Sequence, residues 1–323
     1  MRYLPSTRPH KPRKISPDGS ERARRHRVVA SLFATARARS SSALRPPAAT
    51  SSAPPENVID LHSHILPGID DGPSDMATSV EMARRAGAAG VRKIIATPHV
   101  DHKYDTRAAT IHSAVEALND RLAREQVPVE VLPGAEVAAH RIPELGAREL
   151  AELGLGGGPY LLVEAPLSAS AGDFEIFLGE RPPSERRYVL AHPERSPTLQ
   201  RDPERLQRLL LAGTLMSITA SSLSGRFGST VRRFAISLLE QGMVHNVASD
   251  MHDLRGRPPG ISEHLRAVAG TLPGLEELEP YFTHEVPTAI IAGRSVALPP
   301  RLERARRTGL GLGRMVRAAR PRR

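Results

Sequence analysis

The sequence predicts an α/β fold built on a parallel sheet, most simply a closed barrel of alternating strands and helices. Two observations lead to this prediction. Short apolar runs alternate with amphipathic helical segments about seven times between residues 56 and 300. Ionisable residues follow the ends of the predicted strands, as they do in barrels whose strand carboxyl ends meet on one face. The chain has 323 residues, of which 40% are hydrophobic, which is enough for a buried core.

The alternation begins with an apolar run at residues 58–62, predicted as a buried strand. Ser74 is a suitable N-cap for a helix that ends in a glycine-containing turn, and residues 92–97 form the second strand. Thr106 opens a second helix, which carries apolar residues at helical spacing. Residues 129–132 are the third strand.

The middle of the chain continues the pattern. Pro143 occupies a position typical of the first turn of a short helix that ends at Leu153. A glycine-rich turn at 154–158 then leads into a strand at 160–163, and another strand is predicted at 187–191.

The last predicted elements begin at Pro203, which opens a helix to about residue 212. A strand follows at 215–219. The helix at 229–241 is closed by Gly242, and residues 245–248 are the last clear strand.

The net charge of +10 is carried by the two ends of the chain. Residues 1–55 contain 12 Lys and Arg against 2 acidic residues, and residues 301–323 contain 9 Arg against 1 Glu. The segment between them, 56–300, is acidic, with a net charge of −8. We predict a disordered Arg/Ser/Pro-rich extension over 1–55, one domain over 56–300 and an Arg-rich tail over 301–323. The extension is interpreted as a solvated basic arm or an over-extended gene start, with a transit peptide as the alternative.

The composition excludes several functional classes. The chain has no cysteine, which excludes disulfides, zinc fingers, Fe–S ligation and cysteine nucleophiles, so any metal must be held by His, Asp and Glu. Tryptophan is absent and aromatic residues make up only 3%, which argues against base stacking. No apolar run approaches the ~20 residues of a transmembrane segment.

Two short motifs indicate a metal site. His62 and His64 are two residues apart at the end of the first strand, so their side chains point to one side. Asp250 and His252 repeat this spacing after the last strand. The remaining strand ends carry His99, Glu136, Glu164 and His192. Imidazoles and carboxylates at converging strand ends favour a metal site over a cluster of structural histidines.

Three further residues belong to this prediction. Asp71 lies in a loop seven residues after His64, close enough to fold back onto the site. Arg195 and Arg257 follow His192 and His252, where a guanidinium fork suits a phosphate group.

The same residues resemble a known family. The body resembles the PHP (polymerase and histidinol phosphatase) metal-dependent hydrolases, and more specifically the manganese-dependent protein-tyrosine phosphatases of bacterial capsule and exopolysaccharide operons, the CpsB/YwqE type. The resemblance covers about residues 58–296. It is carried by IDLHSHILPGIDDGP at 59–73, ATPH at 96–99, PGAE at 133–136, LAHPER at 190–195, ITASSLSG at 218–225 and VASDMH at 247–252.

The resemblance implies a distorted (β/α)7 barrel with three divalent metal ions, Mn by family and Fe or Zn as alternatives. Its metal ligands correspond to His62, His64, Asp71, His99, Glu136, His192, Asp250 and His252. Glu164 corresponds to an acidic residue beside the site, and Arg195 and Arg257 to phosphate-binding arginines.

The implied reaction is hydrolysis of phosphotyrosine in proteins by a metal-bound hydroxide, with His252 or Asp250 assisting the leaving group. The implied partner is a bacterial tyrosine kinase of polysaccharide export, the protein itself is expected in the cytoplasm, and no specific nucleic acid is expected. The chain departs from the family pattern at residues 164–166, which read Glu-Ala-Pro, at Asp253, and at the Val-Asp-His that follows His99. The alternatives are a histidinol-phosphate phosphatase, a nuclease, or a non-catalytic binding module with basic tails.

Overall fold

The computed structural model describes residues 57–164, 166–168, 174, 178, 187–299 and 301–305. The extension predicted over 1–55 and most of the tail predicted over 301–323 lie outside these residues. Within the part of the chain that is described, no helix combines the length and hydropathy that a membrane-spanning segment requires.

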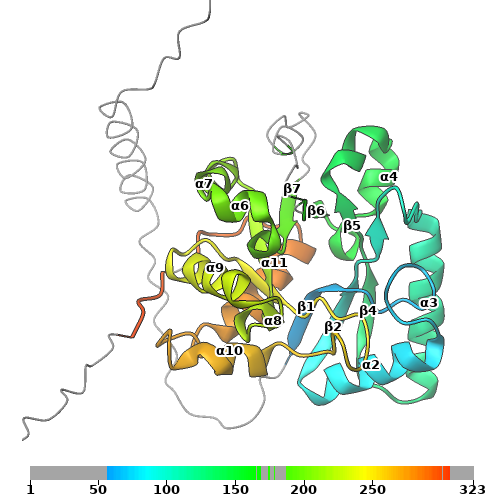
Figure 1. The fold of residues 1–323 in the computed structure, drawn as a ribbon. Coiled ribbons are helices and arrows are strands. Elements are labelled where there is room, and N and C mark those ends of the chain that lie inside the picture. The colour runs from blue at the N-terminus through cyan, green and yellow to red at the C-terminus, as the bar shows by residue number, and fades with distance from the viewer. Residues whose placement is uncertain are drawn as a thin grey trace, which may run out of the picture. The chain divides into compact units, whose positions relative to one another are not determined.

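The amino-terminal strands form a parallel sheet of three, in the order β1-β2-β4 (Figure 1). These strands are β1 (Val58–Ser63), β2 (Val91–Ala96) and β4 (Glu130–Pro133). In the centre of this sheet Ile94 of β2 pairs with Asp60 on one side and Val131 on the other.

A second parallel sheet contains six strands in the order β3-β5-β6-β7-β8-β9. Its strands are β3 (His99–Val100), β5 (Glu136–Ala138), β6 (Tyr160–Glu164), β7 (Arg187–Ala191), β8 (Leu215–Thr219) and β9 (Asn246–Ala248). Every pairing in both sheets is parallel, as the sequence predicts for strands separated by helices.

The two sheets meet where β2 and β4 are interrupted and continue as β3 and β5. Ala96 pairs with Pro133, and three residues later His99 pairs with Glu136. Pro98 lacks an N–H for the ladder, but its carbonyl accepts a hydrogen bond from the Glu136 backbone N–H at 3.1 Å. Gly134 fits because a Cβ there would lie 2.9 Å from Ile95 Cγ2.

The end of β1, an edge strand of the three-stranded sheet, contacts the chain just after β9. Ser63 and Met251 form a parallel bridge, and the backbone N–H of Asp250 donates to the His62 carbonyl at 2.9 Å. The structure confirms the α/β class and the parallel sheets. The sequence predicts one closed barrel, whereas the strands of the structure are divided between two sheets.

Most of the helices lie between successive strands, and the last two follow β9. They are α2 (Met76–Ala88), α3 (Ala108–Arg124), α4 (Ala147–Glu152), α6 (Pro197–Arg201), α7 (Glu204–Leu211), α8 (Ala220–Leu223), α9 (Ser229–Glu240), α10 (Ser262–Ala269) and α11 (Val286–Ile291). Short 3₁₀ turns cover Ala139–Glu144, Leu155–Gly157 and Pro193–Arg195, and a π turn covers Tyr281–Glu285.

Two predicted helix starts differ from the structure. The N-cap of α2 is Asp75 and not Ser74, because the Asp75 carboxylate accepts a hydrogen bond from the Thr78 backbone N–H at 2.9 Å. Helix α3 begins at Ala108 and not at Thr106. Its first N–H donates to the side chain of Glu149 at 2.9 Å, so a carboxylate from α4 replaces the local cap.

The helix predicted from Pro143 to Leu153 is two separate turns. Pro143 lies inside the 3₁₀ turn Ala139–Glu144, and α4 begins only at Ala147. Leu145 between them is extended, with φ −90° and ψ 135°, which ends the first turn.

Strands β1, β6, β7 and β8 are buried almost throughout, on both faces, which explains why they read as largely apolar runs. Along β6, Leu161 and Val163 pack into the larger hydrophobic cluster that includes the helices, whereas Tyr160 and Leu162 pack into a second cluster with Ile59 of β1. Because the strand centres are apolar on both sides, the buried polar side chains gather where the strands end.

Candidate metal centre

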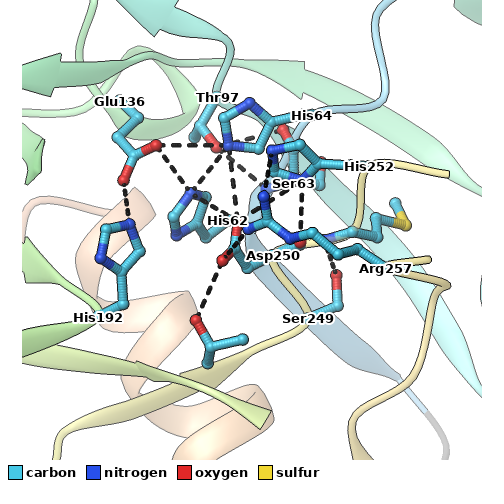
Figure 2. Close-up of polar contacts among 12 residues, drawn as sticks. His62, Ser63, His64, Thr97, Glu136, His192, Ser249, Asp250, His252 and Arg257 are labelled. Atoms are coloured by element: carbon cyan, nitrogen blue, oxygen red, sulfur yellow. Dashed lines mark hydrogen bonds and ion pairs between the residues drawn. The ribbon is translucent and has the colours of Figure 1, made fainter. Parts of the chain in front are cut away.

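Buried imidazoles meet at the end of β1. His62 Nε2 and His64 Nε2 lie 3.2 Å apart, and both side chains are almost fully buried (Figure 2). The i, i+2 spacing therefore brings the two rings to one side, as the sequence predicts. Two ring nitrogens facing each other at this distance form a ready pair of lone-pair donors for a cation.

Glu136, at the start of β5, lies among four histidines. Its Oε2 is 3.4 Å from the Nε2 atoms of both His62 and His64 and 3.2 Å from His99 Nδ1. Its Oε1 is 2.7 Å from His192 Nε2 (Figure 2). Burial alone would raise the pKa of Glu136, but the charges of His62 and His192 hold that pKa well below its usual value.

Asp250 faces both the histidines and the two arginines. Its Oδ1 lies 3.5 Å from His62 Nε2 and 3.6 Å from His64 Nε2. Its Oδ2 accepts hydrogen bonds from Arg195 Nη1 at 2.8 Å and from Thr219 Oγ1 at 3.1 Å, and it also pairs with Arg257 Nη2. Burial opposes ionisation, yet the neighbouring cations lower the pKa of Asp250, so it is a carboxylate.

Asp71 joins His252 and His99 on the more accessible side. Its Oδ1 is 3.3 Å from His252 Nε2 and 3.5 Å from His99 Nε2, and 45% of its side chain is exposed. The hydrogen bond from His252 lowers the pKa of Asp71. His252 Nε2 also lies 2.7 Å from Arg257 Nη1, so the second predicted arginine contacts two predicted site residues.

Glu164 ends β6 beside this cluster. Its carboxylate, His99 and Glu136 each offer one ligand atom within 4.8 Å of the others. Burial raises the pKa of Glu164 to about 8, and the nearby charge of Glu136 adds to this effect. A carboxyl group in this environment gains from a neighbouring cation.

The structure brings all of the predicted site residues together. Their ligand atoms form three overlapping groups, each within 4.8 Å: His62, His64 and Glu136; His64, Asp71, His99 and His252; and His99, Glu136 and Glu164. His192 and Asp250 contact these groups through Glu136 and His62.

The donor atoms of this cluster fit a metal centre. Glu136 Oε2, Asp250 Oδ1, His99 Nδ1 and His192 Nδ1 are buried and have no hydrogen-bond partner among the described residues. A buried lone pair without a partner is destabilising, and here four of them lie within one cluster. Imidazole and carboxylate ligands together suit Mn, Fe or Zn.

The sequence prediction missed two carboxylates, and the first of them orients the cluster. Asp70 Oδ2 lies 2.6 Å from His64 Nδ1 and accepts a hydrogen bond from the His99 backbone N–H at 3.0 Å. Gly72 allows the loop to turn this closely, because a Cβ there would collide with the His64 carbonyl oxygen. A metal-ligating imidazole needs a hydrogen-bond partner on its other ring nitrogen. This rule could have identified Asp70, the residue before Asp71, as that partner.

A second missed carboxylate joins β1 to the chain after β9. Asp60 is buried and accepts hydrogen bonds from the Ser249 backbone N–H at 3.0 Å and from the Ser249 hydroxyl. Burial raises the pKa of Asp60. The contact fixes the position of Asp250, the next residue, relative to His62.

Two of the site residues have left-handed backbone. The φ angle is 32° at His192 and 54° at Asp250, whereas most other positive values are at glycines. Each residue follows a strand directly or closely, and the turn directs its side chain into the cluster.

Comparison with known proteins adds an independent finding. The family model for capsular polysaccharide synthesis, CpsB/CapC, matches residues 58–280. The tyrosine-protein phosphatase YwqE of Bacillus subtilis is 37% identical over 201 residues, which are 62% of this chain and 79% of that protein. The putative tyrosine-protein phosphatase CapC of Staphylococcus aureus is 28% identical over 202 residues, with the same two shares.

Solved structures agree with this similarity. A structure from a study of YwqE from Bacillus subtilis and CpsB from Streptococcus pneumoniae, described as metal-dependent tyrosine phosphatases, matches with a TM-score of 0.63 and 32% identity. The match covers 77% of this chain and 100% of that one. A β-aspartyl dipeptidase from Fervidobacterium islandicum matches with a TM-score of 0.50 at 16% identity, over 76% of this chain and 75% of that one, and shares the fold alone.

Proposed function

Because the chain belongs to the CpsB/CapC family of capsular polysaccharide synthesis, we propose that it is a metal-dependent protein-tyrosine phosphatase. The supporting observation is the position of Asp250, with one carboxylate oxygen beside His62 and His64 and the other on Arg195 and Arg257. A cluster suited to cations therefore directly adjoins two guanidinium groups. This combination suits a phosphoryl group, whose oxygens carry negative charge.

The proposed metal ligands are those of the sequence prediction. His62, His64, Asp71, His99, Glu136, His192, Asp250 and His252 would hold three divalent ions, with Glu164 as a further ligand or a neighbour. We propose Mn²⁺, with Fe and Zn as alternatives that the same donor atoms accept. When bound, such ions supply an activated water for attack on phosphorus and neutralise charge on the phosphoryl oxygens.

The chain's own residues supply binding and orientation. Arg195 uses one guanidinium nitrogen on Asp250 and keeps the others for phosphoryl oxygens, whereas Arg257 divides its two Nη atoms between Asp250 and His252. Arg195 keeps 16% of its side chain exposed and Arg257 keeps 24%, so both border the accessible side of the cluster.

The leaving group is the tyrosine phenolate. Of the two candidate proton donors, Asp250 already accepts hydrogen bonds at Oδ2 from Arg195 and Thr219 and forms an ion pair with Arg257. His252, the other candidate, lies beside Asp71 on the more accessible side of the cluster. Phenol has a pKa of about 10, so the reaction depends less on this proton than hydrolysis of an alkyl phosphate does.

We also propose the fold and domain limits that the resemblance implies. The two parallel sheets would be the parts of a distorted (β/α)7 barrel in a single domain over 56–300. In the part of the chain that the structure describes, side-chain packing continues a few residues beyond residue 300. Leu302 is buried and Arg304 pairs with Glu240 at 2.6 Å.

A tyrosine kinase of polysaccharide export, which would itself carry phosphotyrosine, is the proposed substrate protein, and the cytoplasm is the proposed location of this phosphatase. The similarity to proteins named tyrosine phosphatases supports phosphotyrosine over histidinol phosphate or nucleic acid as the substrate.

The decisive experiment is an assay of the full chain on a phosphotyrosine peptide, histidinol phosphate and single-stranded DNA. We expect hydrolysis of the peptide, loss of activity with a chelator, and recovery with Mn²⁺ that exceeds recovery with Zn²⁺ or Mg²⁺. Preferred hydrolysis of histidinol phosphate or DNA would overturn the proposal. Salt-dependent binding to DNA without any hydrolysis would indicate the basic-tailed binding module instead.

A further inference from the structure

Two aromatic rings beside the cluster are not used by the fold's hydrophobic core, and they differ in what they contact. Four of the described aromatic side chains are partly exposed. Phe234 and Tyr281 pack against the core, and Tyr104 stacks on His99 with Lys103 Nζ 4.3 Å from its ring centre. Phe227 instead lies against Arg195, whose guanidinium carbon is 4.4 Å from the ring centre.

The backbone around Phe227 is a tight turn between α8 and α9. Gly225 and Gly228 flank the phenylalanine closely and have φ angles of 91° and 92°, a region that other residues rarely adopt. The Gly225 N–H donates to the Ser222 carbonyl at 3.2 Å, and the Gly228 N–H donates to the Gly225 carbonyl at 2.9 Å. The position of the ring is therefore set by a hydrogen-bonded turn.

A buried carboxylate joins this turn to the segment that carries Arg195. Glu194 is fully buried, and its Oε1 accepts hydrogen bonds from the Thr219 backbone N–H at 3.0 Å and the Ser222 hydroxyl at 2.7 Å. Glu194 precedes Arg195 in the 3₁₀ turn, and Ser222 lies in α8 just before the Phe227 turn. The carboxylate thus holds both segments in a fixed relation.

We propose that Phe227 is a specificity-determining residue that contacts the phenyl ring of phosphotyrosine while Arg195 holds the phosphoryl group. This inference rests on the proposed function and names how the same site recognises its substrate. Arg195 contacts Asp250 on one side and Phe227 on the other, so a phosphoryl group on this arginine brings its substituent to the ring. Two aromatic rings attract in offset or edge-to-face arrangements, whereas a short aliphatic substituent offers little contact area.

The Phe227 ring can act in one of two ways, through Arg195 or directly on the substrate. A phenylalanine that only covered Arg195 would favour every phosphate monoester equally, because it would act through the guanidinium. A phenylalanine that contacts the substrate favours aryl substituents alone. The two roles therefore predict different responses from aryl and alkyl ligands.

The test compares binding of phenylphosphonate and methylphosphonate, measured calorimetrically on the full Mn²⁺-loaded chain. Both ligands carry the same non-hydrolysable anionic group and differ in the ring. We expect Phe227→Leu to weaken phenylphosphonate binding by about 3- to 10-fold, the size of one aromatic contact, and to leave methylphosphonate binding unchanged. Phe227→Tyr keeps the ring and should restore phenylphosphonate binding.

Phe234→Leu is the matched control, because this partly exposed phenylalanine packs on the core in α9. Its phenyl-to-methyl affinity ratio should equal that of the wild type. Equal weakening of both phosphonates by Phe227→Leu would show that the ring acts through Arg195, and unchanged binding of both would likewise overturn the inference. Wild-type turnover of the phosphotyrosine peptide tests the proposed function separately, so the two failures are distinguishable.

Discussion

Two buried histidines at different places in the fold behave in opposite ways. His245 precedes β9 and accepts a hydrogen bond from the Met216 N–H at 3.1 Å, and burial alone lowers its pKa to about 3. His64 follows β1. Burial opposes its charge too, but hydrogen bonds to Asp70 and Glu136 raise the pKa of His64 to about 10. Burial without an acidic neighbour therefore favours a neutral histidine. Burial beside several carboxylates favours a positive charge at that position.

The largest expected effect comes from removing a histidine of the cluster. His64→Ala should lower kcat/KM for a phosphotyrosine peptide by at least about 10²- to 10³-fold, because the imidazole faces both Glu136 and Asp250. Steady-state kinetics with Mn²⁺ and the metal content of the purified variant measure this. His245→Asn, at the other buried histidine, should keep wild-type kinetics. Full activity in His64→Ala would remove the functional distinction between the two histidines.

A smaller effect is expected from the carboxylate that orients His64. Asp70→Asn should weaken metal affinity or activity by about 10- to 100-fold, as loss of a partner behind a ligating histidine does. Metal titration and kcat/KM together measure it. The matched control is Asp75→Asn, the same substitution at the N-cap of α2, which keeps an acceptor for the Thr78 N–H. Similar losses in both variants would mean that Asp70 only stabilises its loop.

The smallest effect concerns acid stability at His245. Its folded pKa of about 3 lies below the usual 6.5, so the unfolded chain binds the extra proton between these values. The stability that this residue contributes is complete above about pH 6.5 and is lost as the pH falls towards 3. Between pH 7 and 5 this amounts to about 2 kcal/mol of unfolding free energy.

His245→Asn places an amide oxygen where Nδ1 accepts the Met216 N–H, and it cannot titrate. Its unfolding free energy should therefore fall less than that of the wild type between the two pH values. Denaturant unfolding at each pH gives the difference. Parallel pH dependence in the two proteins would show that His245 is not held neutral in the folded state.

The sequence predicted the parts of this fold that depend on local pattern. The apolar strands and the i, i+2 pair His62/His64 follow from spacing alone, and the structure places them as expected. Asp250 and His252 also meet in the cluster, but through the left-handed turn at Asp250 and not through extended spacing. Strands β3 and β5 were not predicted, because two or three residues carry no periodicity. They exist because β2 and β4 resume pairing after Pro98 and Gly134.

Other features depend on partners distant in the sequence. Nothing local distinguishes Asp70 from Asp71, and only the position of the His64 ring separates their roles. The start of α3 is set by Glu149, 41 residues after Ala108. The neighbours of Phe227 are similarly remote, since Arg195 lies in a different turn of the chain.

The left-handed backbone at His192 and Asp250 has a consequence for how this protein can change. This conformation costs about 1–2 kcal/mol for most residues, less for Asp, Asn and His, and nearly nothing for glycine. A laboratory selection for heat resistance alone, with no demand for turnover, should therefore accept glycine or asparagine at these positions. A selection that demands turnover should keep both residues. Selection for thermal stability and selection for activity therefore favour different residues at these two positions.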